Sequence, residues 1–174
     1  DTVINCIYRS ETIMRMETDV KRSIIELGDE GRIVNMQLEE LMANVEDEEK
    51  LIIQEYNINK EISTQSILEE IRKIDKKNLI VSEKIVKLLG YEVSSDILDT
   101  NVSPKGYRIL SKVPKMPSSI IEKTVEAFGS LQHICSASID ELDDVEGIGE
   151  IRARIINQSL KRLQEQYILK SYNI

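Results

Sequence analysis

Apolar residues recur every three or four positions through the first 27 residues of the chain, with one gap at Ser10. The members of this stripe are Val3, Ile7, Ile13, Met16, Val20, Ile24 and Leu27. Such spacing places them on one face of a long helix, and Gly28 supplies its end. After the segment GDEG at 28–31, a second stripe predicts another helix, and it consists of Val34, Leu38, Leu41 and Val45.

The rest of the first ninety residues also predicts helices. The charged run EDEEK at 46–50 precedes LIIQEY at 51–56, and its carboxylates predict a solvated helix start near the positive end of the helix dipole. Ser63 and Ser82 are placed to cap two further helices, and Gly90 closes the second. No stretch alternates with period two for long enough to predict a strand. Residues 1–90 are therefore expected to form an all-α bundle.

Residues 91–106 show little periodicity and are rich in turn-forming residue types, which predicts a connection between domains. We expect a helical linker domain at 1–103 and a second domain at 104–174. The chain starts with Asp1 rather than Met, and its first residues lack the basic and apolar regions of a signal peptide. The sequence therefore predicts a fragment of a longer protein.

The segment from Ser138 to Leu163 is the most informative part of the chain. Ser138 and Glu141 have the spacing of a capping box, so a short helix is expected to start there. Gly147, Ile148 and Gly149 follow, and then a longer helix whose inner face carries Ala153, Ile156, Leu160 and Leu163. The glycines permit a tight turn and a close approach of the backbone. The unpaired N–H groups that begin the next helix would form an anion site.

A similar segment lies 32 residues upstream. Leu110, Val113, Met116, Ile121 and Phe128 correspond to Leu142, Val145, Ile148, Ala153 and Leu160. The turn at 114–117 contains two prolines instead of the glycines, and Ser119 with Glu122 has the spacing of a second capping box. Pro117 removes one N–H donor, so Lys112 and Lys115 would have to supply positive charge. The fold expected for residues 104–174 is therefore a tandem pair of helical hairpins.

Composition and charge agree with packed helices and distinguish the two parts. Hydrophobic residues make up 41% of the 174 residues, with one Phe and no Trp, and no run is apolar enough to span a membrane. Residues 1–100 contain 13 lysines and arginines against 22 aspartates and glutamates, whereas residues 101–174 contain 10 against 9. Two distant cysteines predict reduced thiols and a cytoplasmic protein. The two parts are expected to have different roles.

The sequence does not predict catalysis by this chain. His133 is the only histidine, which excludes histidine-rich metal sites and makes a Ser-His-Asp triad improbable. There is no phosphate-binding loop of the Walker type, and Gly147 and Gly149 follow no predicted strand. The carboxylates at 46–49 and 143–144 are interpreted as solvated faces or helix starts. We therefore expect no catalytic residue, cofactor or metal in this chain.

The pattern around Gly147 and Gly149 resembles the helix-hairpin-helix motif, which binds the DNA backbone without sequence specificity. The resemblance implies that the hairpin amides contact a phosphate. Many members have a lysine where this chain has Ile151, and Glu150 would repel a phosphate, so weak binding is expected. The candidate DNA-binding residues are Gly147, Ile148, Gly149, Ile151, Arg152, Arg154, Lys112, Lys115 and Lys161.

A broader resemblance extends over essentially the whole chain. It is carried by IIELGDEGRIVNMQLEELM at 24–42, PKGYRILSKVPKMP at 104–117, VEGIGEIRARII at 145–156 and LKRLQEQ at 160–166. In this order they resemble the C-terminal part of DisA-family proteins, bacterial diadenylate cyclases that scan DNA integrity. The resemblance implies a homo-oligomeric parent protein whose cyclase domain, absent here, uses ATP and a divalent metal such as Mg²⁺. The cyclase motifs Asp-Gly-Ala and Arg-His-Arg do not occur in this chain.

Three functions remain open from the sequence. The first is a module that binds branched or distorted DNA and reports to the cyclase domain of the parent chain. The second is a scaffold in which the helices assemble the parent oligomer and the hairpins mediate protein contacts. The third is another repair protein with the same tandem hairpins, although residues 24–42 and the absence of nuclease or ligase residues count against it. None of the three involves a membrane.

Overall fold

The computed structural model describes residues 1–59, 61–75 and 83–172, with side chains in the last helix described as far as residue 166. Every regular element within these ranges is helical, which confirms the predicted all-α class. The chain divides into two compact units, Asp1–Asn101 (unit 1) and Val102–Ile174 (unit 2). Of the helices described, none is long and apolar enough to cross a membrane.

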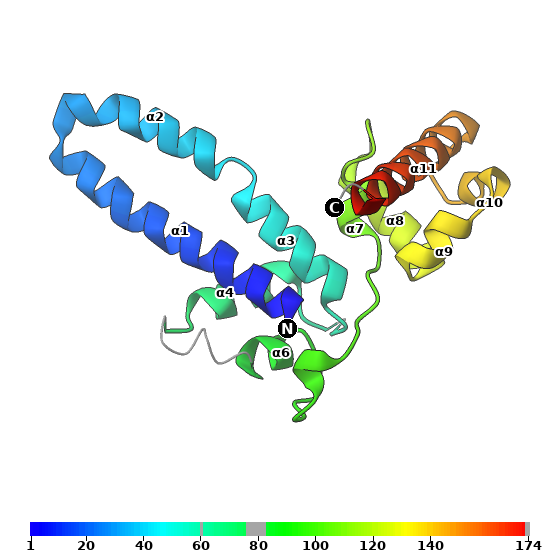
Figure 1. Ribbon diagram of the computed structural model, residues 1–174, viewed down its shortest axis with the longest axis horizontal. Coiled ribbons are helices and arrows are strands. Elements are labelled where there is room, and N and C mark those ends of the chain that lie inside the picture. The colour runs from blue at the N-terminus through cyan, green and yellow to red at the C-terminus, as the bar shows by residue number, and fades with distance from the viewer. Residues whose placement is uncertain (60, 76–82, 173–174) are drawn as a thin grey trace. The chain divides into compact units, whose positions relative to one another are not determined.

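Unit 1 begins with a long helical hairpin. Helix α1 (Thr2–Glu26) runs antiparallel to α2 (Gly31–Met42), and α3 (Val45–Tyr56) continues back along α1 (Figure 1). The short 3-10 helix η1 (Gly28–Glu30) forms the tip of the hairpin. Gly28 has a φ of 59°, in the left-handed region that glycine adopts without strain, so the predicted end of the first helix is confirmed.

The predicted stripe on α1 is buried only at its N-terminal end. Of the predicted residues, Ile7 belongs to the core of unit 1 and Val3 packs against it, whereas Ile13, Met16 and Val20 are exposed. Ile4, which was not predicted, is also buried there. The core also receives side chains from α3 and from two shorter helices, α4 (Thr64–Arg72) and α6 (Glu83–Leu88). The N-terminal part of α1 is therefore packed on the core, and its C-terminal part forms the hairpin with α2 (Figure 1).

Local hydrogen bonds fix the ends of α4. The Ser63 hydroxyl accepts a hydrogen bond from the Ser66 N–H at 3.1 Å, which confirms the predicted cap. At the other end, the Arg15 guanidinium donates to the Ile74 carbonyl at 2.8 Å and ties α1 to the segment after α4. The predicted cap at Ser82 lies outside the described residues. A 3-10 helix, η2 (Ile97–Asp99), lies in the segment that follows α6.

The predicted solvated helix start at 46–50 is wrong in one respect, because Glu49 within this charged run is buried. Glu46, Asp47 and Glu48 do occupy the first turn of α3, as expected. Glu49, however, is 0% exposed, and neither of its carboxylate oxygens has a hydrogen-bond partner. Burial and the nearby charge of Glu11 raise the pKa of the Glu49 carboxyl from 4.5 to about 7. The run is therefore solvated on one face of α3 and buried on the other.

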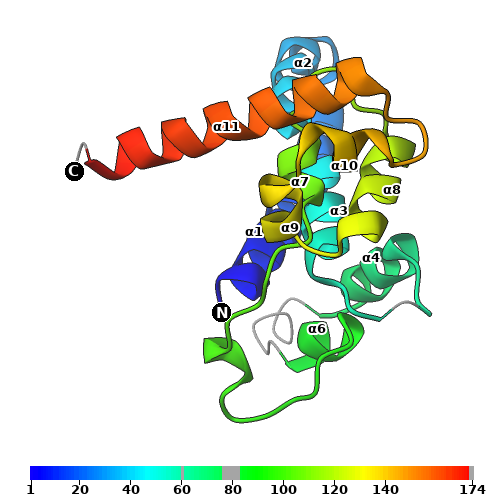
Figure 2. The ribbon, with the colours of Figure 1, turned by 90° about the vertical axis from the view of Figure 1, so that its right-hand side faces the viewer.

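Unit 2 contains two segments in which a short helix, a turn and a longer helix follow each other. The first consists of α7 (Tyr107–Leu110) and α8 (Ser118–Phe128), and the second of α10 (Ile139–Asp143) and α11 (Glu150–Tyr172). Helix α9 (Leu131–Ser136) connects them. Figure 2 shows α11 extending well beyond the other helices of this unit. The helix order thus agrees with the two predicted hairpins.

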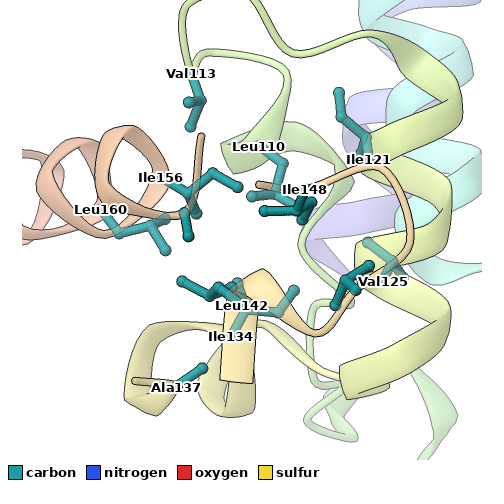
Figure 3. Packing of buried hydrophobic residues seen from close by; sticks show 12 residues of the cluster. Leu110, Val113, Ile121, Val125, Ile134, Ala137, Leu142, Ile148, Ile156 and Leu160 are labelled. Atoms are coloured by element: carbon teal, nitrogen blue, oxygen red, sulfur yellow. The ribbon is translucent and has the colours of Figure 1, made fainter. Parts of the chain in front are cut away.

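The two segments share one hydrophobic core. Figure 3 shows side chains from both segments and from α9 pointing into a common interior. Most of the predicted inner residues are confirmed as buried, whereas Met116, Phe128 and Leu163 are half-buried. The core consists of Leu110, Val113, Ile121, Val125, Ile134, Ala137, Leu142, Val145, Ile148, Ala153, Ile156 and Leu160. Neither segment could bury its apolar face alone, so each stabilises the other.

One of the two predicted capping boxes exists. The Ser138 hydroxyl accepts from the Glu141 N–H at 3.2 Å, and the Glu141 carboxylate accepts from the Ser138 N–H at 2.7 Å. The hydrogen bonds that the Glu141 carboxylate accepts from the Ser138 N–H and from the Ser138 hydroxyl lower the pKa of the Glu141 carboxyl. The predicted box of Ser119 and Glu122 is wrong, because α8 starts at Ser118 with Pro117 in the N-cap position and no side-chain cap.

Candidate functional site

At the turn between α10 and α11, the first backbone N–H groups of α11 have no hydrogen-bond acceptor within the helix. The Ile148 N–H bonds to the Val145 carbonyl at 2.9 Å, and the Ile148 side chain is buried in the core. The Ala153 N–H bonds to the Gly149 carbonyl at 3.0 Å. The N–H groups of residues 150–152 precede this first helical bond, so the helix supplies no acceptor for them. Together with the helix dipole they form a position that favours an anion.

The two glycines of this turn have different physical roles. Gly147 has a φ of 86°, and a Cβ atom there would lie 2.6 Å from Cδ1 of Ile120. The turn itself therefore requires glycine at this position. Gly149 has no left-handed φ, and a Cβ atom built on it would have no heavy atom within 4 Å. The fold leaves open space in front of Gly149, where a ligand could approach the backbone.

The turns of both segments line one cavity of about 570 Å³. Its lining residues are Pro114, Lys115, Gly149, Glu150, Ile151, Arg152 and Ile155. Lys115 has a φ of 60°, a left-handed conformation that is uncommon for a residue with a side chain. The fold therefore brings the first turn, at 114–117, next to the start of α11.

Two cations and one carboxylate lie at this cavity. Lys115 and Arg152 line it, and the Arg152 guanidinium donates a hydrogen bond to the Gly147 carbonyl, across the turn. Glu150 also lines the cavity, but it forms an ion pair with Arg154 one helical turn later. This pairing reduces the repulsion that Glu150 exerts on an anion. The balance of charge in the cavity is therefore positive.

The structure brings together only part of the predicted site. Lys115, Gly149, Ile151 and Arg152 line the cavity, while Ile148 is buried beneath the turn and Gly147 shapes it. The lining does not include three predicted cations, which are Lys112, Arg154 and Lys161. Sequence reasoning did not assign Pro114, Glu150 or Ile155 to the site. Ile155 follows Ile151 by four residues, a spacing that places both on one helix face and could have indicated it.

A second cavity in unit 2 has the opposite character. It measures about 620 Å³ and is lined by Lys123, Glu126, Ala127, Phe128, Glu141, Asp144, Val145 and Glu146. The only cation in this lining, Lys123, forms an ion pair with Glu146 at 2.9 Å. Its carboxylates disfavour a phosphate, although the cavity is the larger of the two. The cavity with Lys115 and Arg152 is therefore the better candidate for an anionic ligand.

The described residues provide no alternative centre for metal chemistry. Within 1–59, 61–75 and 83–172, no group of three or more His, Cys, Asp and Glu side chains could hold a metal ion. His133 lies on α9, and its Nδ1 is 3.0 Å from the Phe128 carbonyl oxygen. This contact joins α9 to the end of α8, which is a structural role.

Comparison with known proteins identifies relatives over almost the whole chain. A family model described as the DisA bacterial checkpoint controller linker region matches residues 1–98. The DNA integrity scanning protein DisA of Carboxydothermus hydrogenoformans is 52% identical over 94% of this chain and 47% of its own length. DisA of Acetivibrio thermocellus is 44% identical over 98% of this chain and 48% of its own length. The chain thus spans about half the length of these curated relatives.

Proposed function

The chain belongs to the DisA family, and we propose that its unit 2 binds the DNA backbone without sequence specificity. The proposed ligand is branched or distorted DNA, held by helix-hairpin-helix contacts. The observation that supports this proposal most strongly is the open space in front of Gly149, a residue of the cavity that both turns line. The names of the relatives, which refer to DNA integrity scanning, agree with this ligand.

The geometry suggests how a phosphate would be held. Its oxygens would accept hydrogen bonds from the N–H groups that begin α11, and a side chain on Gly149 would obstruct that approach. Lys115 and Arg152 would neutralise charge from opposite turns of the cavity. Contacts of this kind carry no sequence information, so any preference must come from the shape of the DNA.

Unit 1 is proposed to couple DNA binding to a diadenylate cyclase domain of the parent protein. That domain would convert ATP to cyclic di-AMP with a divalent metal such as Mg²⁺, within a cytoplasmic homo-oligomer. This chain itself is proposed to hold neither cofactor nor metal and to catalyse no reaction. Coupling would be reciprocal, so that nucleotide binding in the cyclase domain changes DNA affinity by the same factor as DNA changes nucleotide affinity.

The replacement Gly149→Ala tests the proposed function most directly. We expect it to weaken DNA binding about tenfold or more, because a methyl group in front of the helix start removes a charge-assisted hydrogen bond. The measurement is fluorescence anisotropy of a labelled four-way junction and of a duplex of equal length, at two salt concentrations. The wild-type chain should bind both in a salt-dependent way and prefer the junction.

The matched control for this replacement is Ser138→Ala. It removes the N-cap of α10, which destabilises the same unit by about 1 kcal/mol but leaves the cavity intact. Its DNA affinity should stay near that of the wild type. Equal losses in both variants would show that stability alone accounts for the effect. Absence of wild-type binding at micromolar protein would contradict the proposed function.

Arg152→Ala should weaken DNA binding and reduce its salt dependence. If Arg152 neutralises one phosphate, the slope of log affinity against log salt should become smaller by about one. Arg162→Ala is the matched control, because Arg162 is an exposed arginine on the same helix that does not line the cavity. Anisotropy titrations over a range of salt concentrations measure both slopes. An unchanged slope for Arg152→Ala would remove this residue from the site.

A scaffold function is supported by a separate observation in unit 1. The hairpin of α1 and α2 exposes large apolar side chains, and the most exposed are Ile25, Ile33, Met36 and Leu41. Exposed apolar surface of this extent is typical of a protein contact. Unit 1 could therefore assemble or orient the parent protein, and such a role is compatible with DNA binding by unit 2.

A further inference from the structure

An exposed isoleucine lies within the cavity that both turns of unit 2 line. Ile151 is 79% exposed, although Ala153, Ile156 and Leu160 of the same helix are buried. Its side chain therefore adds little to the packing of unit 2. Ile155, one helical turn later, and Pro114, from the first turn, supply the other apolar lining of the cavity.

The apolar part of the cavity lies beside its cations. Lys115 and Arg152 belong to the same lining as Ile151, and so does the open side of Gly149. A ligand that complements this lining needs anionic groups directly beside apolar faces. A DNA strand has this arrangement, because each phosphate is flanked by sugars and by the faces of the bases. A free phosphate would leave Ile151 in water.

We propose that Ile151 is a wedge that inserts at a base step which is already unstacked. This inference rests on the proposed DNA binding and names the feature of DNA that unit 2 recognises. Aliphatic side chains can insert between base steps from the minor groove, and insertion requires that the bases separate. At a bulge or junction the bases are already separated, so less unstacking is needed. Ile151 therefore favours open DNA over a continuous duplex, whereas phosphate contacts bind both.

The test compares two labelled duplexes of equal length, one continuous and one with a two-nucleotide bulge. Ile151→Ala should lower affinity for the bulged duplex about fivefold to tenfold, because it removes most of the inserted apolar surface. Affinity for the continuous duplex should change by less than about twofold, because the phosphate contacts remain. Ile151→Leu should keep most of the preference. Because Ile151 is exposed, none of these changes should disturb folding.

The matched control is Ile33→Ala, which removes an exposed isoleucine from α2 of unit 1. It should bind both duplexes as the wild type does. A direct readout is 2-aminopurine placed beside the bulge, whose fluorescence rises when the base unstacks. The wild-type chain should increase this signal more than Ile151→Ala does.

Three results would contradict the proposed insertion of Ile151 at an unstacked base step. Equal losses on both duplexes would make Ile151 a general contact, and no loss on either would remove it from the interface. Equal 2-aminopurine signals for wild type and Ile151→Ala would exclude insertion. Failure of the wild-type chain to bind either duplex would instead overturn the proposed DNA binding itself, and the wedge with it.

Discussion

Unit 1 is expected to lose about 3 kcal/mol of stability as the pH rises from 4.5 to 7, because of the buried Glu49 carboxyl. In the folded chain burial holds the pKa of this group at about 7, above its ordinary value of 4.5. Protonation of Glu49 therefore favours the folded state, because the folded chain binds this proton more tightly than the unfolded chain does. This contribution is complete below pH 4.5 and disappears as the pH passes 7.

The charges around Glu49 determine how large the effect is. Burial is the main cause of its raised pKa, followed by the charge of Glu11, and Arg72 acts in the opposite direction. The Glu11 charge is itself paired with Arg15 at 3.0 Å. Glu46 adds a smaller repulsion, and hydrogen bonds from Arg72 and Lys50 lower its own pKa. The contribution of Glu46 to stability is therefore complete above pH 4.5 and is lost only below it, so it stays constant within the window in which Glu49 acts.

The replacement Glu49→Gln should abolish this dependence between pH 4.5 and 7. An amide resembles the protonated carboxyl, so the variant should match the wild type near pH 4.5 and exceed it by about 3 kcal/mol at pH 8. Urea unfolding followed by circular dichroism gives the free energies, and NMR of α3 amides assigns the transition to unit 1. Asp47→Asn, an exposed change on the same helix, is the control. A pH profile shared by wild type and Glu49→Gln would contradict the assignment.

Helix positions could be predicted because their signals are local. The apolar spacing and Gly28 predicted the first helix, and Ser63 and Ser138 predicted caps that the structure contains. The error at Ser119 has a local cause as well. Pro117 occupies the N-cap position, so the helix begins before Ser119 could cap it. A capping-box spacing is thus insufficient when a proline can begin the helix earlier.

Burial and the composition of the site depend on tertiary packing, which spacing does not reveal. Glu49 has the same local surroundings as its solvated neighbours in the charged run, and it is buried by the packing of other helices on α3, which include α1 and α4. The predicted cations were chosen by charge and helix position. The first turn folds against the start of α11, and Lys115 and Arg152 are therefore the predicted cations that line the cavity together with Gly149.

The largest effect expected in unit 2 comes from Ile148→Ala. Ile148 is 4% exposed and fills the core beneath the turn, next to residues of both helical segments (Figure 3). Its truncation should lower the free energy of unfolding by about 2–4 kcal/mol, since it leaves a cavity. Urea unfolding measures this loss. The same change should weaken the proposed DNA binding, although Ile148 does not line the ligand cavity.

The second effect follows from the position of Ile148 between Gly147 and Gly149. The two glycines restrain the backbone little, so we expect the buried side chain, together with the bond from the Ile148 N–H to the Val145 carbonyl, to hold the N–H groups of residues 150–152 in place. Ile134→Ala separates this role from stability, because Ile134 is equally buried but lies on α9. Under conditions in which both variants are folded, only Ile148→Ala should lose DNA affinity. Equal affinities in the two variants would show that the core does not position the turn, and that the donors of α11 are held by backbone geometry alone.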